Sequence, residues 1–146
     1  MAMRDLRQER EQRHGGVREE PLRAAAALRG ALGLTSWRGR SGRRYVAGVH
    51  PLTDAAALEV SDAVVIAVRR DGDGFARVID AAAVGPRLTP RAKTSWAARA
   101  RALGATEMHV HRLVEDEREA KAIAADLLGD ESALTALAPD APGPGR

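Results

Sequence analysis

The sequence predicts an α+β domain in which a small, mainly antiparallel sheet of three to five strands is flanked by helices. Residues 62–85 contain two apolar runs separated by Asp-Gly-Asp-Gly, which is typical of a β-hairpin. Residues 89–103 and 116–128 carry apolar side chains at helical spacing and begin with residues that favour helix N-termini. The chain of 146 residues is long enough for one such domain with a modest core.

The charge pattern divides the chain into a basic N-terminal arm and helix (1–34), an α/β core (35–129) and a flexible tail (130–146). Residues 1–44 contain 11 Arg, no Lys and 5 acidic residues, a net charge of +6, whereas the remainder sums to −3. A basic arm can contact nucleic acid or another polyanion. The alternative is a solvated tail, because Arg outnumbers Lys 21 to 2 throughout the chain.

Within the arm, residues 17–33 have apolar side chains near helical spacing. We expect them to form a helix that packs on the domain or on a partner helix. Residues 1–16 offer no apolar stripe, and the tail is rich in Pro and Gly. Both segments are expected to be disordered.

Residues 36–50 predict another hairpin, with its turn at Ser41-Gly42. Trp37 and Tyr45 flank a cluster of arginines, and cationic groups interleaved with aromatic rings can hold a phosphate backbone and stack a base. In the alternative interpretation the two aromatic residues belong to the core and the arginines are solvated charges on an edge strand. The arginines are Arg38, Arg40, Arg43 and Arg44.

The remaining elements follow from local signals. Residues 51–61 form a connector with one helical turn, and the apolar run 63–68 indicates a strand buried on both faces. The helix at 89–103 has Thr89 as its N-cap, Pro90 in its first turn and Gly104 as its stop. Its expected inner face consists of Trp96, Ala100 and Leu103.

Residues 106–114 predict a strand with two histidines on one face. Met108 and Val110 point one way, and His109 and His111 point the other. Two histidines at this spacing could begin a zinc site; the alternative is a pair of surface or edge histidines. In the helix that follows, the expected inward residues are Ala120, Ile123 and Leu127.

The chain contains no cysteine, which excludes disulfides and thiolate metal sites. Its first ten residues lack the apolar run of a secretory signal, and no apolar run approaches the roughly 20 residues that span a bilayer. A cytoplasmic protein that does not enter a membrane is therefore expected.

The hairpin AVVIAVRRDGDG…DAAAVG, with the following helix, strand and helix, resembles the GIY-YIG nuclease domain over residues 43–128. The most specific part is GATEMHVH at residues 104–111. The resemblance implies a three-stranded antiparallel sheet between helices. In active members of the family, a glutamate holds one divalent metal ion, and tyrosines, an arginine and often a histidine assist DNA cleavage.

This chain departs from that pattern at the positions that carry the chemistry. Val65 and Ala83 stand where the resemblance places the two tyrosines, and Ala124 stands at the position of the metal-binding glutamate. Asp126 lies two residues further along the helix and points about 200° away, so it cannot simply replace that carboxylate. The resemblance therefore implies a degenerate domain with no catalytic residues and no metal or other cofactor.

We expect a non-catalytic module that interacts with nucleic acid or with a protein through the 17–33 helix. One alternative is a magnesium-dependent DNA endonuclease that uses the relocated residues Asp80, Glu107, His109 or His111. The other is a structural, partner-binding protein without a nucleic-acid role. The expected nucleic-acid contacts are Trp37, Arg38, Arg40, Arg43, Arg44 and Lys93.

Overall fold

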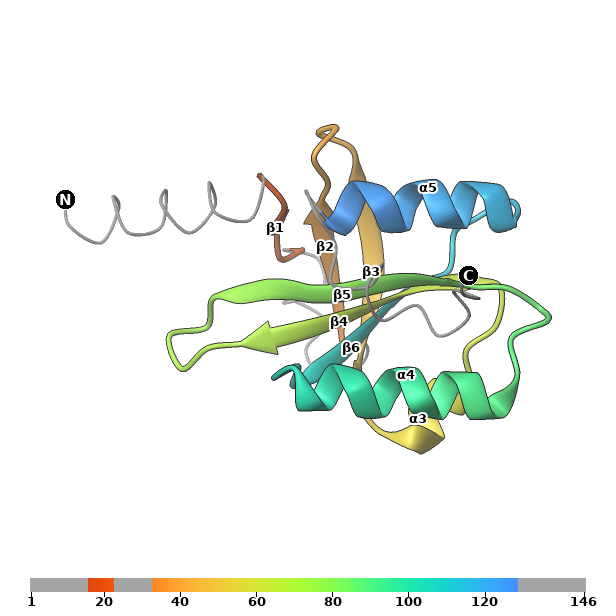
Figure 1. Ribbon diagram of the computed structural model, residues 1–146. Coiled ribbons are helices and arrows are strands. Elements are labelled where there is room, and N and C mark those ends of the chain that lie inside the picture. The colour runs from red at the N-terminus through yellow and green to blue at the C-terminus, as the bar shows by residue number, and fades with distance from the viewer. Residues whose placement is uncertain (1–15, 23–32, 129–146) are drawn as a thin grey trace, which may run out of the picture.

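A curled, six-stranded antiparallel sheet organises the computed structural model of this chain, which describes residues 16–22 and 33–128. Its strands lie in the order β1-β2-β3-β6-β4-β5 (Figure 1). They are β1 (Arg18–Glu19), β2 (Leu34–Arg38), β3 (Arg44–Pro51), β4 (Ala63–Arg70), β5 (Ala76–Val84) and β6 (Glu107–His111). The helices are α3 (Asp54–Leu58), α4 (Pro90–Ala102) and α5 (Glu117–Leu128).

The predicted α+β class with an antiparallel sheet is confirmed, but the described sheet has six strands rather than three to five. The hairpin β2–β3 extends the sheet beyond β6, and β1 adds a further edge. A helix predicted to begin at residue 17 is wrong at Arg18–Glu19, because these residues pair with Arg38 and Trp37 of β2. Residues 23–32, and the predicted disorder of residues 1–15 and of the tail from residue 129, lie outside the described residues.

Strand β4 separates the core into two apolar layers. Alternate side chains of a strand point to opposite faces, so Val64, Ile66 and Val68 pack toward α5, whereas Ala63, Val65 and Ala67 pack toward α4. All six are fully or almost fully buried, which confirms the predicted interior strand. Figure 1 shows α5 above the sheet and α3 and α4 below it.

Both predicted hairpins are present. In β4–β5 the turn is closed by a hydrogen bond from Gly74 N to Asp71 O of 2.9 Å, and Gly74 has a φ of 89°. The pairing shifts between Ala67 and Val68, so that Ile79 has no partner on β4 and forms a bulge in the edge strand β5. The bulge places Arg77 and Asp80 on the face of β5 that is covered by α4.

Helix α4 begins and ends as its sequence predicts. The Thr89 side chain accepts a hydrogen bond from Ala92 N, Pro90 opens the helix, and Gly104 follows with a φ of 104°. The inner face contains Trp96 and Ala100 as expected. Leu103 lies beyond the last helical residue and is 46% exposed, so its predicted inward orientation is wrong. The expected inward residues of α5 and the helical turn at α3 are confirmed.

Candidate nucleic-acid interface

The carboxylate of Asp126 on α5 binds the tip of the β2–β3 hairpin through hydrogen bonds. Asp126 accepts hydrogen bonds from Ser41 N at 2.8 Å, Ser41 Oγ at 2.7 Å and Tyr45 Oη at 2.8 Å. Burial raises the pKa of Asp126, but the hydrogen bonds from Ser41 and Tyr45 hold it below its usual value. A side chain at Gly39 would collide with the Asp126 carboxylate, so the close approach of helix and turn requires glycine there.

The carboxylate of Glu20 forms ion pairs with three arginines beside this tip. Glu20 contacts Arg38 Nε at 2.8 Å, Arg44 Nε at 3.0 Å and Arg18 Nε at 3.2 Å. The hydrogen bond from Arg38 is the largest cause that lowers the pKa of Glu20. We call Arg18, Arg38, Arg40, Arg43 and Arg44 the hairpin arginines. Together with the carboxylates of Glu20 and Asp126, they give the tip a net charge of +3.

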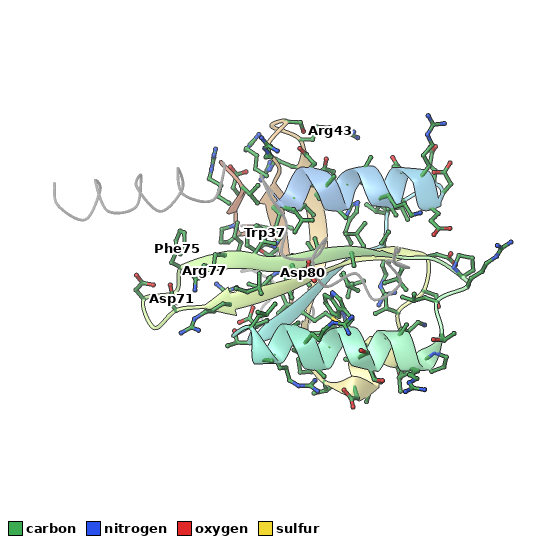
Figure 2. All side chains as sticks on the ribbon, viewed as in Figure 1. Trp37, Arg43, Asp71, Phe75, Arg77 and Asp80 are labelled. Atoms are coloured by element: carbon green, nitrogen blue, oxygen red, sulfur yellow. The ribbon has the colours of Figure 1, made fainter. Side chains whose placement is uncertain are left out.

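Arg40 and Arg43 lie in the turn between β2 and β3. Neither makes an ion pair within 4.0 Å among the described residues, and the guanidinium of Arg43 lies 5.8 Å from the centre of the Tyr45 ring. Figure 2 shows Arg43 at the tip of the β2–β3 hairpin. The sequence identified the cluster but missed Arg18 and Glu20. The charged run before Pro21 was interpreted as a helix start, and no local signal pairs it with residues near 38.

The structure does not bring the other expected contacts to this surface. Trp37 is fully buried beneath α5, and Tyr45 is 4% exposed, so both are core residues as in the alternative interpretation. Lys93 lies on α4, on the opposite side of the sheet, where Nζ is 3.5 Å from the Leu58 carbonyl oxygen (Figure 1). The arginines alone therefore make up the exposed part of the predicted interface.

The three positions that the resemblance assigns to catalysis do not share a site. Ala83 and Ala124 belong to the apolar layer beneath α5, whereas Val65 packs toward α4. The residue that pairs with Ala83 is Val64, which lies in the same layer as Ala83 and Ala124. A shift of one residue along a strand moves a side chain to the other face. Val65 and Ala83, which stand where the resemblance places the two tyrosines, therefore face opposite layers, and both are apolar.

His109 is the centre of a buried polar chain that the sequence did not predict. Trp37 Nε1 donates to His109 Nδ1 at 2.9 Å, so the proton of the neutral ring is on Nε2, which faces Glu107 Oε1 at 2.9 Å. Glu107 continues the chain to Arg70, whose guanidinium also binds Glu19 of β1 at 3.0 Å. Figure 2 labels Trp37, which lies between α5 and the sheet.

The prediction of surface or edge histidines is wrong, because His109 is fully buried and His111 is 4% exposed. Strand β6 lies between β3 and β4, so its histidines face the layer beneath α5 rather than solvent. Burial lowers the pKa of His109 despite the neighbouring carboxylate. Burial raises the pKa of Glu107, but hydrogen bonds from Arg70 and His109 bring it below its usual value.

Asp80 is buried on the other face of the sheet. Its two oxygens accept hydrogen bonds from Ala81 N at 2.9 Å and from Trp96 Nε1 at 3.0 Å. Burial raises the pKa of Asp80 to about 6, although both hydrogen bonds and the charge of Arg99 lower it. Asp80 is thus separated by the sheet from Glu107, His109 and His111. Among the described residues, no three His, Asp or Glu side chains are grouped closely enough to hold a metal ion.

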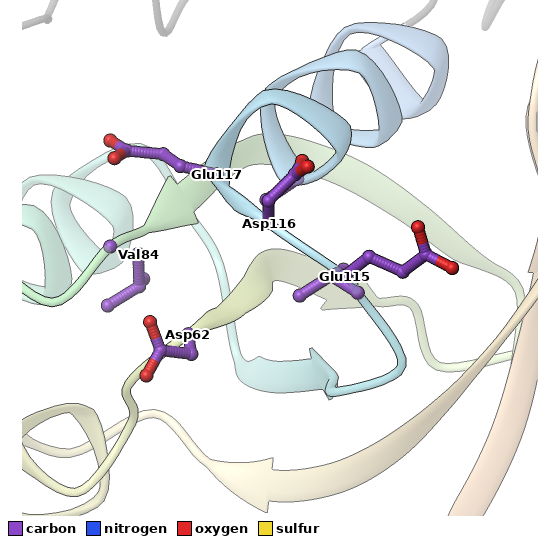
Figure 3. A pocket seen from close by; sticks show the side chains of 8 residues that line it. Asp62, Val84, Glu115, Asp116 and Glu117 are labelled. Atoms are coloured by element: carbon purple, nitrogen blue, oxygen red, sulfur yellow. The ribbon is translucent and has the colours of Figure 1, made fainter.

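An acidic pocket lies where β5 ends and α5 begins. Asp62, Glu115, Asp116 and Glu117 line it, but Figure 3 shows their carboxylates pointing in different directions. Asp116 Oδ1 accepts a hydrogen bond from Glu119 N at 2.8 Å, which identifies it as a helix cap. The acids at this end therefore have a structural role at the helix N-terminus, where negative charge is favourable.

A shallow apolar groove of about 340 Å³ crosses β3 and β6 on the face covered elsewhere by α4. Its lining includes Val46, which is 39% exposed, and Leu113, which is 75% exposed. Helices α3 and α4 cover the part of this face that belongs to β4, β5 and β6. The described part of the chain does not cover the groove.

The chain was compared with models of protein families, with curated proteins and with solved structures, and each search returned no match. None of the helices in the described ranges is long and apolar enough to cross a membrane.

Proposed function

We propose that this chain is a non-catalytic, GIY-YIG-like domain that binds nucleic acid through the hairpin arginines. The observation that carries the proposal is the excess of positive charge on a structured tip, where five arginines outnumber the two carboxylates of Glu20 and Asp126. Lys and Arg that neutralise phosphates release condensed counterions, and this release provides sequence-independent affinity for nucleic acid.

The arrangement of the central elements supports the likeness to the GIY-YIG fold. Strands β5, β4 and β6 are adjacent and antiparallel, and they lie between α4 on one face and α5 on the other. The chain order hairpin, helix, strand, helix is the one that the resemblance implies. Strands β1, β2 and β3 extend this unit on the side of β6, and the hairpin arginines belong to that extension.

The proposed lack of catalysis depends on the side chains at the family positions. Ala83 and Ala124 lie in the apolar layer beneath α5, and Val65 packs toward α4. None of the three supplies a group that could hold a metal ion or transfer a proton. The metal-dependent endonuclease remains the alternative. Incubation with plasmid DNA and single strands in the presence of Mg²⁺ or Mn²⁺ distinguishes the two, because cleavage that survives further purification would contradict a non-catalytic domain.

Binding is tested by fluorescence anisotropy with labelled nucleic acid at low salt. The double variant Arg40→Ala/Arg43→Ala removes the two hairpin arginines that make no ion pair within 4.0 Å among the described residues, and it should weaken binding several-fold. The matched control is Arg87→Ala/Arg91→Ala, which removes the same charge from exposed positions at the start of α4. Equal weakening by both pairs would show that net charge, not the hairpin tip, determines binding.

A further inference from the structure

The hairpin arginines have no well-exposed aromatic ring beside them, because the Tyr45 ring under Arg43 is almost fully buried. The chain contains two Trp, one Tyr and one Phe. Trp37 is fully buried, Tyr45 is 4% exposed and Trp96 is 9% exposed. Phe75 is partly exposed, but it lies at the turn of the other hairpin, β4–β5 (Figure 2). Proteins that bind single strands stack bases on exposed aromatic rings, typically for about 1–3 kcal/mol per base, and this surface offers no such ring.

The tip presents its charges in a fixed arrangement. Asp126 holds the turn through Ser41 and Tyr45, while Glu20 occupies the Nε edges of Arg38 and Arg44. The N–H donors of Arg40 and Arg43 are available to a phosphate, because no described carboxylate lies within 4.0 Å of either guanidinium group. A planar guanidinium binds phosphate through two parallel hydrogen bonds.

Arginines carried by a structured turn bind best to phosphates whose spacing is also fixed, as it is along the two backbones of a duplex. A duplex provides about one charge per 1.7 Å of its axis, on a stiff backbone whose bases are already stacked. A single strand has a lower charge density and loses the stabilisation that exposed aromatic rings would supply.

We propose that the hairpin tip binds the phosphate backbone of a double-stranded nucleic acid without stacking on its bases. This inference rests on the proposed nucleic-acid binding and specifies the form of the ligand. Arg40 and Arg43 make the phosphate contacts, Glu20 holds Arg38 and Arg44 beside them, and Asp126 holds the turn that carries them.

The test compares a short duplex of mixed sequence with each of its strands alone, by anisotropy over a series of salt concentrations. We expect tighter binding of the duplex, little dependence on base composition and unchanged tryptophan fluorescence, since Trp37 and Trp96 are buried. Arg40→Ala/Arg43→Ala should reduce the slope of log K against log salt by about 2, because each duplex phosphate contact contributes roughly 0.9. Arg87→Ala/Arg91→Ala should leave that slope unchanged.

Tighter binding of the single strands, with base preference or with quenched tryptophan fluorescence, would overturn the duplex inference and leave nucleic-acid binding in place. A duplex slope that Arg40→Ala/Arg43→Ala does not change would overturn the assignment of the contacts. A chain that binds neither duplex nor single strand at low salt would instead remove the proposed function itself. The failures of the two proposals therefore give different results.

Discussion

Replacing the buried carboxylate of Asp80 by an amide should change the pH dependence of stability. Asp80 is 2% exposed, and its pKa is raised from 3.8 to about 6. Each pKa unit corresponds to about 1.4 kcal/mol. At pH 7 the ionised carboxylate therefore costs the folded state about 3 kcal/mol relative to an unperturbed one.

The sign follows from proton linkage. Between pH 6 and 4 the folded chain holds a proton on Asp80 more tightly than the unfolded chain, so acidification stabilises the fold through this group. In Asp80→Asn this contribution is absent. The amide also turns its NH₂ group toward either Ala81 N or Trp96 Nε1, and the resulting loss of one hydrogen bond is independent of pH.

The assay is urea unfolding of wild type and Asp80→Asn between pH 4 and pH 7. The difference in their unfolding free energies should change by roughly 2 kcal/mol over this range, with wild type relatively more stable at the acid end. Asp54→Asn controls for the loss of an exposed carboxylate. A difference that stays constant with pH would refute the argument, because Asp80 would then have the same proton affinity in the folded and unfolded states.

Three further substitutions test the buried contacts. Gly39→Ala should destabilise the fold by about 1–3 kcal/mol because its methyl group displaces the Asp126 carboxylate and its hydrogen bonds, whereas Gly72→Ala, with open space around it, should have little effect in the same urea titration. Trp37→Phe leaves His109 Nδ1 without its donor, which should lower the unfolding free energy by about 1–3 kcal/mol in addition to the cost of repacking. His109→Gln should remove a loss of stability on acidification. The lowered pKa of His109 means that wild type loses stability as the pH falls below about 6.5, and unchanged acid sensitivity in the variant would contradict this.

Local patterns predicted most elements, because their causes are local. The Asp-Gly turn, the Thr89 cap and the stop at Gly104 each depend on neighbouring residues, and each is found where the sequence places it. The two-residue strand Arg18–Glu19 was missed because its pairing with β2 depends on residues about 20 positions away. No propensity signals a strand so short.

The candidate site was predicted only in part, for the same physical reason. The arginines are a run in the sequence, so their cluster was visible. The burial of Trp37 depends on the curl of the sheet and on His109, which is 72 residues away. The hydrogen bonds that hold the turn depend on Asp126, which is 85 residues from Ser41. The layer that Val65 faces depends on the register of its strand with β5, and the residues around Val65 alone do not reveal that register.

The way β4 is shared between the two apolar layers has a consequence for how the molecule unfolds. Each layer draws every second side chain from this one strand, and α4 and α5 both pack against those side chains. Pulling β4 out of the sheet would expose Val64 and Val65 together, along with the partners of both. The upper and lower halves of the protein should therefore not melt one after the other, and a single cooperative transition is expected for the described core.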